Sequence, residues 1–260
     1  MVMRMLDLHC HILPDIDDGA SNISVSIEMA KRLAADGVST VACTPHILPG
    51  VYHNHGSDIR EKIVVLQRAI NDAGIDLKLV PGSDAHMSPD FIPKLNNGSI
   101  LTLADSRYVL VEPPHHVAPR RLEQFFFDIL IAGYVPILTH PERLTWINLQ
   151  YTSIQRLAAG GVWMQITAGS LTGDFGRSAR YWGERMLEEG LVHILATDAH
   201  DVMKRPPNLF RGVEAAAKLI GEPAAMDLVV TRPRGIISDV PPKNLPSPSQ
   251  FNAAPKSRRA

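Results

Sequence analysis

The alternation of short, apolar, β-rich segments with longer amphipathic segments constrains the fold of this chain more than any other feature. Seven segments have the length and composition of buried strands, and they are RMLDLH (4–9), STVACT (39–44), DLKLVPG (76–82), RYVLVE (107–112), YVPILT (134–139), VWMQIT (162–167) and VHILAT (192–197). Amphipathic segments lie between them, and two of these, SVSIEMAKRLAADG and DIREKIVVLQRAINDAG, end in a glycine suited to a helix C-cap. The alternation predicts βα units around a parallel sheet, and seven strands favour a closed or nearly closed barrel.

Length and composition bound the domain organisation. With 260 residues the chain can bury a full core, as one large α/β barrel or as two smaller domains. The longest apolar stretch, FFFDILIAGYVPIL, is interrupted by Asp128 and is too short to cross a bilayer. From about Pro241 the sequence becomes rich in proline, serine and basic residues. We therefore expect a single domain over residues 1–240 and a disordered tail over residues 241–260.

Charge and cysteine content narrow the partners and the compartment. The formal net charge is −1, which argues against nucleic acid or an anionic membrane as the main partner. Two cysteines are too few for a disulfide framework, and the segment MVMRM does not begin a secretory signal. We therefore expect a reduced, cytoplasmic protein that does not span a membrane.

Nearly every predicted strand ends in a histidine or a carboxylate. The residues in these positions or in the loops just beyond them are His9, His11, Asp18, His46, Asp84, Glu112, His140, Asp198 and His200. Because the C-terminal ends of all strands in a parallel barrel open on the same face, these side chains would meet in one cavity. Burying so many polar groups together without a cation would be costly. The sequence therefore predicts a metal centre at this end of the barrel.

Other polar residues near these positions are expected to act locally. His86 and His193 follow strands and fit hydrogen-bonding loop residues. Asp15 and Asp17 in DIDDG fit turn chemistry. The histidine pair at 115–116 fits a surface loop or the metal centre equally well, and the sequence leaves this open.

The ligand types indicate both the ions and the chemistry. Imidazoles and carboxylates without a thiolate suit manganese, iron or zinc better than calcium, and nine candidates suffice for two or three ions. Clustered ions polarise phosphoryl oxygens and make hydroxide available near neutral pH. Arg143 and Arg205 follow ligand-bearing strands and could grip phosphate oxygens. The Cys-x5-Arg loop of cysteine phosphatases is absent, since Ile16 and Pro49 occupy the arginine positions.

The motifs DLHCHILPDIDDGA, TPH, DSRYVLVE, THPER and ATDAHDVMKRPP together resemble those of the PHP (polymerase and histidinol phosphatase) superfamily. Within it they are similar to the bacterial protein-tyrosine phosphatases of capsule and exopolysaccharide biosynthesis, the CpsB/CapC type. The resemblance covers residues 5 to 238 and implies a distorted, TIM-like (β/α)7 barrel, the PHP fold. It also implies hydrolysis of phosphotyrosine by a metal-activated hydroxide, on the tyrosine-rich tail of a membrane-associated tyrosine autokinase.

The resemblance further implies how three divalent ions, manganese or iron, share the ligands. Ion by ion, the sets are His9, His11 and Asp198; Asp84, Glu112 and His140, with Asp84 bridging the first two ions; and Asp18, His46 and His200. Arg143 and Arg205 fall at positions that bind phosphate in this family. The family commonly has glutamate where this chain has Asp84, which draws the carboxylate back by about 1.5 Å. We expect Asp84 to bind metal nonetheless.

Three other functions remain open at this point. The first is a PHP phosphoesterase acting on a small-molecule phosphate, such as histidinol phosphate or a nucleotide. The second is an amidohydrolase-type metal hydrolase, which typically has a bridging lysine where this chain offers Glu112. The third is a non-catalytic, metal-stabilised regulator that binds a partner through the basic tail.

Overall fold

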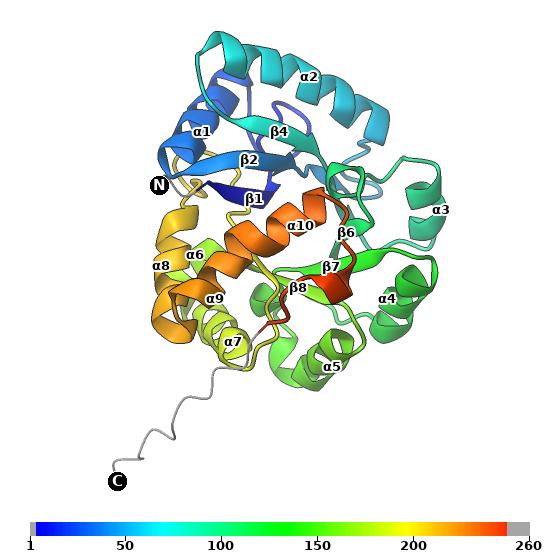
Figure 1. Cartoon of the computed structure of the whole chain (residues 1–260). Helices are drawn as coiled ribbons and strands as arrows, with labels where there is room; N and C mark the ends of the chain where they lie inside the picture. The colour runs from blue at the N-terminus through cyan, green and yellow to red at the C-terminus, as the bar shows by residue number, and fades with distance from the viewer. Residues whose placement is uncertain (1–3, 249–260) are drawn as a thin grey trace.

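Parallel strands form the centre of the molecule and helices cover them. In the computed structural model, which describes residues 4–248, the strands curve around the middle and the helices lie outside (Figure 1). The strands are β1 Met5–Cys10, β2 Val38–Cys43, β3 His46–Ile47, β4 Lys78–Pro81, β5 Asp84–His86, β6 Tyr108–Glu112, β7 Val135–Thr139, β8 Trp163–Thr167 and β9 Ile194–Ala196. A strand therefore stands at each of the seven predicted positions, and the α/β class is confirmed.

The strands pair in two sheets that share two chain segments. The sheet orders are β1-β2-β4 and β3-β5-β6-β7-β8-β9, and all the neighbouring strands in both run parallel. Two residues separate β2 from β3 and β4 from β5, so the chain passes directly from the first sheet to the second just beyond two of the predicted strands. A further parallel backbone bridge joins Cys10 to Ala199, next to β9.

Helices follow most of the strands and have the expected local signals. They are α1 Ile23–Ala35, α2 Gly56–Asp72, α3 Phe91–Asn96, α4 Leu122–Ile131, α5 Ile147–Ala159, α6 Ala168–Thr172, α7 Gly176–Glu188, α8 Leu209–Ile220, α9 Glu222–Met226 and α10 Arg232–Ile237. The Asn22 side chain caps α1 by accepting from the Val25 N–H, and Gly37 follows its end at a φ of 89°. Among the described residues, the helices are all too short or too polar to span a bilayer.

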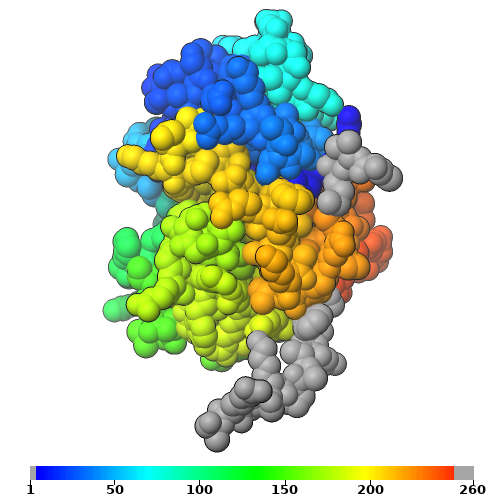
Figure 2. Space-filling model, turned by 90° about the vertical axis from the view of Figure 1, so that its left-hand side faces the viewer, coloured from blue at the N-terminus to red at the C-terminus, as the bar shows by residue number. Residues whose placement is uncertain are grey.

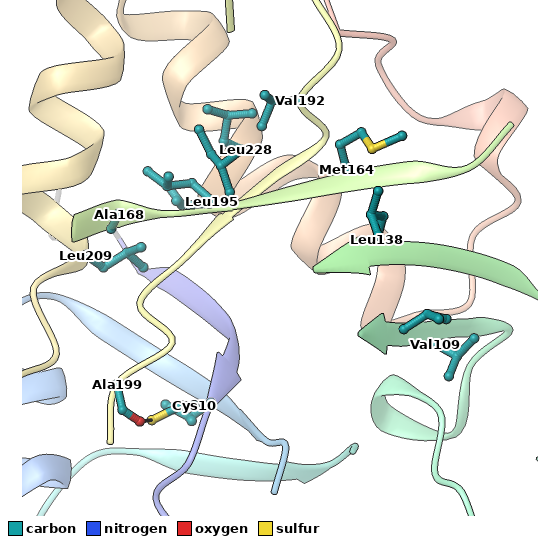
Figure 3. Packing of buried hydrophobic residues seen from close by; sticks show 14 of the residues in the cluster. Cys10, Val109, Leu138, Met164, Ala168, Val192, Leu195, Ala199, Leu209 and Leu228 are labelled. Carbon is teal, nitrogen blue, oxygen red and sulfur yellow. Dashed lines mark hydrogen bonds between the residues drawn. The ribbon is translucent and has the colours of Figure 1, made fainter. Parts of the chain in front are cut away.

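The core has an outer layer, between strands and helices, and an inner layer enclosed by the strands. Figure 2 shows part of the outer surface, where the segment after β9 (yellow) lies between α1 (blue) and α7 (yellow-green). In the outer layer, Leu138, Met164 and Leu195 from β7, β8 and β9 face away from the inner layer, and Leu228 packs near Leu195 (Figure 3).

The inner layer fills the N-terminal ends of the strands. Tyr108, Trp163 and Ile194, the first residues of β6, β8 and β9, pack together with Ile236 from α10. In Figure 1, α10 lies across this end of the strands. Because apolar groups occupy this end, the polar strand ends are left for the opposite face.

The chain after residue 240 departs from the predicted tail over its first residues. Pro242–Asn244 form a 3-10 turn, Leu245 packs against the inner layer, and its side chain lies so close to Gly235 that a Cβ there would be 2.3 Å away. Residues 241–248 are therefore packed against the domain, because Leu245 supplies an apolar anchor within an otherwise polar segment. The rest of the predicted tail, residues 249–260, lies outside the described residues.

Candidate metal centre

The C-terminal ends of the strands bring all nine predicted ligands into one connected cluster. The side chains come from β1, β3, β5 and β6 and from the segments just after β1, β7 and β9. Seven are buried, and these are His9, His11, Asp84, Glu112, His140, Asp198 and His200. His46 is 13% exposed at its side chain, and Asp18 is 49% exposed. The cluster is therefore mostly withdrawn from water, with Asp18 at its rim.

Asp198 and Asp84 connect the histidines on the β1 side of the cluster. Asp198 Oδ1 lies 3.3 Å from His9 Nε2 and 3.3 Å from His11 Nε2. Asp84 Oδ2 lies 3.4 Å from His9 Nε2 and 3.3 Å from His46 Nδ1. The shorter aspartate therefore still reaches two histidines from different strands.

Two further groups flank this pair. Asp18 Oδ1 lies 3.5 Å from His46 Nε2 and 3.4 Å from His200 Nε2. Glu112 Oε2 lies 3.2 Å from His46 Nδ1, and Glu112 Oε1 lies 3.6 Å from His140 Nε2. His46 thus stands between the Asp18 group and the Glu112 group.

The donor set fits divalent metal ions. Ligand atoms about 2.1 Å from one ion lie about 3.0 to 3.4 Å apart in octahedral or tetrahedral arrangements, close to the separations seen here. Several buried ligand atoms form no hydrogen bond of good geometry among the described residues, although some lie within 3.5 Å of another ligand, and these are His46 Nδ1, both Asp84 oxygens, Glu112 Oε2, His140 Nδ1 and His200 Nε2. Buried polar atoms are rarely left unpaired, so these atoms indicate a ligand that the protein itself does not supply.

The groups that can converge on one ion overlap rather than divide into three separate sets. Five groups offer ligand atoms within 4.8 Å of one another: His11, Asp18, His46 and His200; His9, His11 and Asp84; His9, His140 and Asp198; His46, His86 and Glu112; and Glu112, His115 and His140. The structure therefore keeps Asp18, His46 and His200 together and adds His11 to them. It also brings in two histidines, His86 and His115, that were not among the predicted ligands.

His86 pairs with one of the predicted ligands. Its Nε2 lies 2.5 Å from Glu112 Oε2, and β5 pairs with β6 so that His86 stands opposite Glu112. The signal was present in the sequence, because residues two apart on a strand share a face and Asp84 was already a candidate. His115 Nε2 lies 3.3 Å from Glu112 Oε1, which places this histidine beside the centre. His193 has the expected local role, as its Nδ1 accepts from the Met164 N–H at 3.1 Å.

Two polar residues outside the predicted set orient the first two histidines. Asp17 Oδ2 lies 2.7 Å from His11 Nδ1 and also accepts from the His46 N–H at 3.0 Å. Gln165 Oε1 lies 3.0 Å from His9 Nδ1. Holding Nδ1 in this way leaves Nε2 directed at the cluster, as is common for metal-binding histidines. Asp17 was predicted for turn chemistry, which it also performs by accepting from the Gly19 N–H.

Burial and neighbouring charges shift the ionisation of several groups in the cluster. Burial lowers the pKa of His9, but Asp198 and Asp84 outweigh it and raise the pKa to about 9. Burial opposes ionisation of Asp198, yet His9 and Arg205 hold its pKa well below its usual range. Burial, and next the Arg143 charge, hold the pKa of His140 well below its usual value. Asp198 is therefore an anion and His140 a neutral imidazole, which are the forms that bind metal, whereas His9 would have to release a proton when it binds an ion.

The two predicted arginines stand at the edge of the cluster on the same carboxylate. Arg143 Nη1 and Arg205 Nη2 both donate to Asp198 Oδ2, while Asp198 Oδ1 faces the histidines. The Arg143 guanidinium lies 4.3 Å from the centroid of the Phe175 ring, and that of Arg205 lies 5.7 Å away. Phe175 therefore holds both guanidinium groups at the mouth of the centre through cation–π contacts.

Hydrogen bonds of Glu142 hold the turn that carries His140 and Arg143. The buried Glu142 carboxylate accepts from the Thr167 N–H at 2.9 Å and from Ser170 Oγ at 2.7 Å. His140 adopts a left-handed backbone with φ of 34°, and Asp198 does so with φ of 51°. Such conformations are rare outside glycine and recur at functional sites, which agrees with the placement of both residues in the centre.

The fold and the centre define a class: parallel-strand α/β proteins that gather histidines and carboxylates able to bind metal ions at the strand ends. The chain belongs to the CpsB/CapC family of capsular polysaccharide synthesis, whose sequence model matches residues 5–238. It is 38% identical to the tyrosine-protein phosphatase YwqE of Bacillus subtilis over 201 residues, 77% of this chain and 79% of YwqE. It is 30% identical to the tyrosine-protein phosphatase CpsB of Streptococcus pneumoniae over 240 residues, 90% of this chain and 99% of CpsB.

The structural comparison agrees with the sequence comparison. Crystal structures of YwqE and CpsB are described as those of unique metal-dependent tyrosine phosphatases. The matching chain superimposes with a TM-score of 0.87 at 34% identity, covering 90% of this chain and 95% of that chain. The family predicted from the sequence motifs is confirmed.

Proposed function

We propose that this protein is a metal-dependent protein-tyrosine phosphatase that hydrolyses phosphotyrosine. One observation carries the proposal: a buried set of histidines and carboxylates with unpaired ligand atoms lies directly beside two arginines on one carboxylate. The relatives YwqE and CpsB, both tyrosine-protein phosphatases, support the substrate class.

The cluster would hold two or three divalent ions, with manganese ahead of iron or zinc. The proposed ligands are His9, His11, Asp18, His46, Asp84, Glu112, His140, Asp198 and His200, and His86 joins them through Glu112. When bound, such ions polarise phosphoryl oxygens and lower the pKa of water, so that hydroxide is available near neutral pH. Asp17 and Gln165 keep His11 and His9 oriented toward the ions.

The side chains of the mouth would bind the phosphoryl group. Arg143 and Arg205 present guanidinium donors next to the cluster, a geometry suited to the outer oxygens of a phosphate ester. Phe175 limits their movement. The departing phenolate has a pKa of about 10, so it leaves more readily than an alkoxide and depends less on a protonating side chain.

The chain's thiols have no place in this chemistry. Cys10 and Cys43 are fully buried, and Cys10 Sγ donates to the Ala199 carbonyl at 3.7 Å, a contact visible in Figure 3. Burial raises the pKa of both thiols. Neither sulfur is therefore available as a thiolate nucleophile.

The same proposal extends to the architecture and the setting. The shared segments between the two sheets and the Cys10–Ala199 bridge support a single distorted (β/α)7 barrel with the PHP fold. The physiological substrate would be a phosphotyrosine protein of capsule or exopolysaccharide synthesis, namely a membrane-associated tyrosine autokinase. Two free cysteines are consistent with a reducing, cytoplasmic compartment.

The proposal is tested by elemental analysis of the purified protein together with turnover of a phosphotyrosyl peptide and of an alkyl phosphate. We expect at least two ions per chain and preferential hydrolysis of the peptide. A chelator should abolish turnover and a thiol reagent should leave it intact. Preference for a small alkyl phosphate would instead identify a small-molecule phosphoesterase, and metal binding without turnover of either substrate would identify a non-catalytic regulator.

The assignment of Asp84 has its own test. Asp84→Ala should reduce the metal content per chain, because both Asp84 oxygens are buried, unpaired and within reach of His9 and His46. Asp90→Ala is a matched control, since Asp90 is an exposed aspartate that pairs with Lys94. An unchanged metal content in the Asp84 variant would remove Asp84 from the ligand set.

A further inference from the structure

A basic cavity adjoins the metal centre on one side of Phe175. It has a volume of about 450 Å³ and opens between the segment after β9 and the α6–α7 region, on the face seen in Figure 2. The polar and aromatic residues of its wall are Lys204, Arg205, Arg211, Asn208, Asp174 and Phe175. Arg205 belongs to both places, since it lines the cavity and donates to Asp198 in the centre.

The charge of this cavity is positive and largely uncompensated. Arg205 pairs with Asp198, and the other two cations, Lys204 and Arg211, share the wall with one carboxylate, that of Asp174, which accepts from Thr172 Oγ1 at 2.8 Å. Within residues 4–248, Lys204 and Arg211 form no ion pair. Their charges are therefore free to interact with an anionic group that enters from solvent.

The cavity wall is held by local structure and is not a chance meeting of surface side chains. Asp201 Oδ1 accepts from the N–H groups of Met203 and Lys204, both at 2.5 Å, which fixes the turn that precedes Arg205. Gly212 lets α8 approach α6 closely, because a Cβ there would lie 2.5 Å from the Ala168 Cβ. This close packing places the neighbouring Arg211 on the cavity.

A second cavity on the other side of Phe175 has a different character. It has a volume of about 360 Å³ and includes Arg143 together with Leu144, Ile147 and Trp182. The two proposed phosphate-binding arginines thus each open onto a different cavity, one lined by mixed polar and apolar side chains and one basic. When a polypeptide places its phosphotyrosine at these arginines, the residues on one side of that phosphotyrosine would lie along the basic cavity.

We propose that the basic cavity binds an anionic side chain of the substrate polypeptide close to the phosphotyrosine. The inference rests on the proposed phosphatase function and refines it, because it specifies an acidic phosphotyrosyl segment as the substrate. Lys204 and Arg211 supply the attraction, and Arg205 connects the cavity to the phosphoryl site. Aspartate, glutamate and a second phosphotyrosine share the required anionic chemistry.

The experiment compares three peptides that carry one phosphotyrosine flanked by alanines, by glutamates, or by a second phosphotyrosine. The measured quantity is the ratio of kcat/KM for each acidic peptide to that for the alanine peptide. For the metal-loaded wild type we expect a ratio of about ten, from one or two partly exposed ion pairs. The Lys204→Glu/Arg211→Glu variant should bring the ratio to one or below, and salt should reduce the wild-type ratio.

The control variant is Arg120→Glu/Arg121→Glu, which makes the same charge change in another basic cavity, beside α4. It should keep the wild-type ratio. A wild-type ratio of one, or a ratio lost only in the Arg120/Arg121 variant, would overturn the assignment of the cavity. Turnover of p-nitrophenyl phosphate, which is too small to fill the cavity, tests the phosphatase function separately from the anion-binding role of the cavity. Its absence in the metal-loaded wild type would overturn the phosphatase function, and the inference with it.

The two acidic peptides are compared by their kcat/KM ratios, and the peptide with the larger ratio identifies the anion that the cavity prefers. A larger ratio for the glutamate peptide assigns the cavity to carboxylates, and a larger ratio for the doubly phosphorylated peptide assigns it to a second phosphotyrosine. Either result supports the cavity as an anion site, provided that the preference for that peptide is lost in the Lys204→Glu/Arg211→Glu variant.

Discussion

The two ends of the strands both bury charged side chains, but they satisfy them in opposite ways. At the N-terminal end, Arg232 is 2% exposed and donates to the carbonyl oxygens of Pro246, His193 and Ser247 at 2.8, 2.9 and 3.3 Å. At the C-terminal end, both oxygens of the fully buried Asp84 lack any hydrogen-bond partner among the described residues. Burial alone therefore does not separate a structural charge from a functional one.

The difference lies in whether the protein completes its own polar contacts. At the N-terminal end, Tyr108 donates to the Val240 carbonyl at 2.7 Å, and His193 stacks on Trp163 with ring centroids 4.7 Å apart. Such an end is stable without any ligand. At the C-terminal end, most of the unpaired buried atoms belong to the predicted metal ligands, and bound ions would satisfy them.

Metal removal should give the largest contrast between the two ends. Chelation should abolish phosphatase activity and lower the thermal midpoint, since each ion at one hundred times its Kd contributes about 2.7 kcal/mol. Calorimetry and p-nitrophenyl phosphate turnover, before and after dialysis against a chelator, measure the two effects. Readdition of manganese should restore both. An unchanged midpoint and full activity after verified metal loss would show that the unpaired atoms need no cation.

Replacing Arg232 should destabilise the protein without affecting its chemistry. Arg232→Met removes three partly buried hydrogen bonds to carbonyl oxygens, and we expect a loss of about 3 kcal/mol in the free energy of unfolding. Urea denaturation measures the loss. Arg232→Lys keeps the charge and should lose less. Reduced metal content in the folded Arg232→Met protein would contradict the separation of the two ends.

Asp17→Asn should weaken metal binding by about 10- to 100-fold while the fold persists. The carboxylate holds His11 Nδ1, and an amide holds it less firmly. Competition against a metal indicator gives the affinity. Asp15→Asn, an exposed change in the same loop, is the matched control and should bind metal as the wild type does. Equal affinities in both variants would leave Asp17 with a turn function only.

Phe175→Leu should have the smallest effect, a rise in KM for aryl phosphates of about threefold with little change in kcat, because one cation–π contact contributes about 0.5–1 kcal/mol. The aromatic ring supports Arg143 and Arg205, which in turn donate to Asp198. Steady-state kinetics measures the change, and Phe175→Tyr, which keeps the ring, should restore the wild-type KM. If Phe175→Tyr shows the same rise in KM, the effect comes from general disruption of the loop and not from the missing ring.

Much of the fold was predictable because its signals are local. The strands and the first two long helices fall where apolar runs, polar periodicity and terminal glycines place them. The breaks between β2 and β3 and between β4 and β5 were not predictable, since they arise where each strand passes from one sheet to the other. The packing of residues 241–248 was missed as well, because a proline- and serine-rich composition hides a single anchoring residue, Leu245.

The candidate centre was also predictable in part: its ligands could be predicted, but the contacts that orient them could not. Positions at strand ends identified the ligand types, while the orienting contact of Gln165 with His9 spans 156 residues and leaves no local pattern. His86 was undervalued because its significance depends on the pairing of β5 with β6, which brings it opposite Glu112.

The sequence by itself determined the positions and order of the seven main β segments and the chemical nature of the residues that follow them, because hydrophobic period and side-chain type are properties of short segments. Only the tertiary structure decided which imidazole faces which carboxylate and which buried atoms remain unpaired. Those outcomes depend on strand register and on contacts between distant segments, such as Asp198 with His9, and no short segment encodes them.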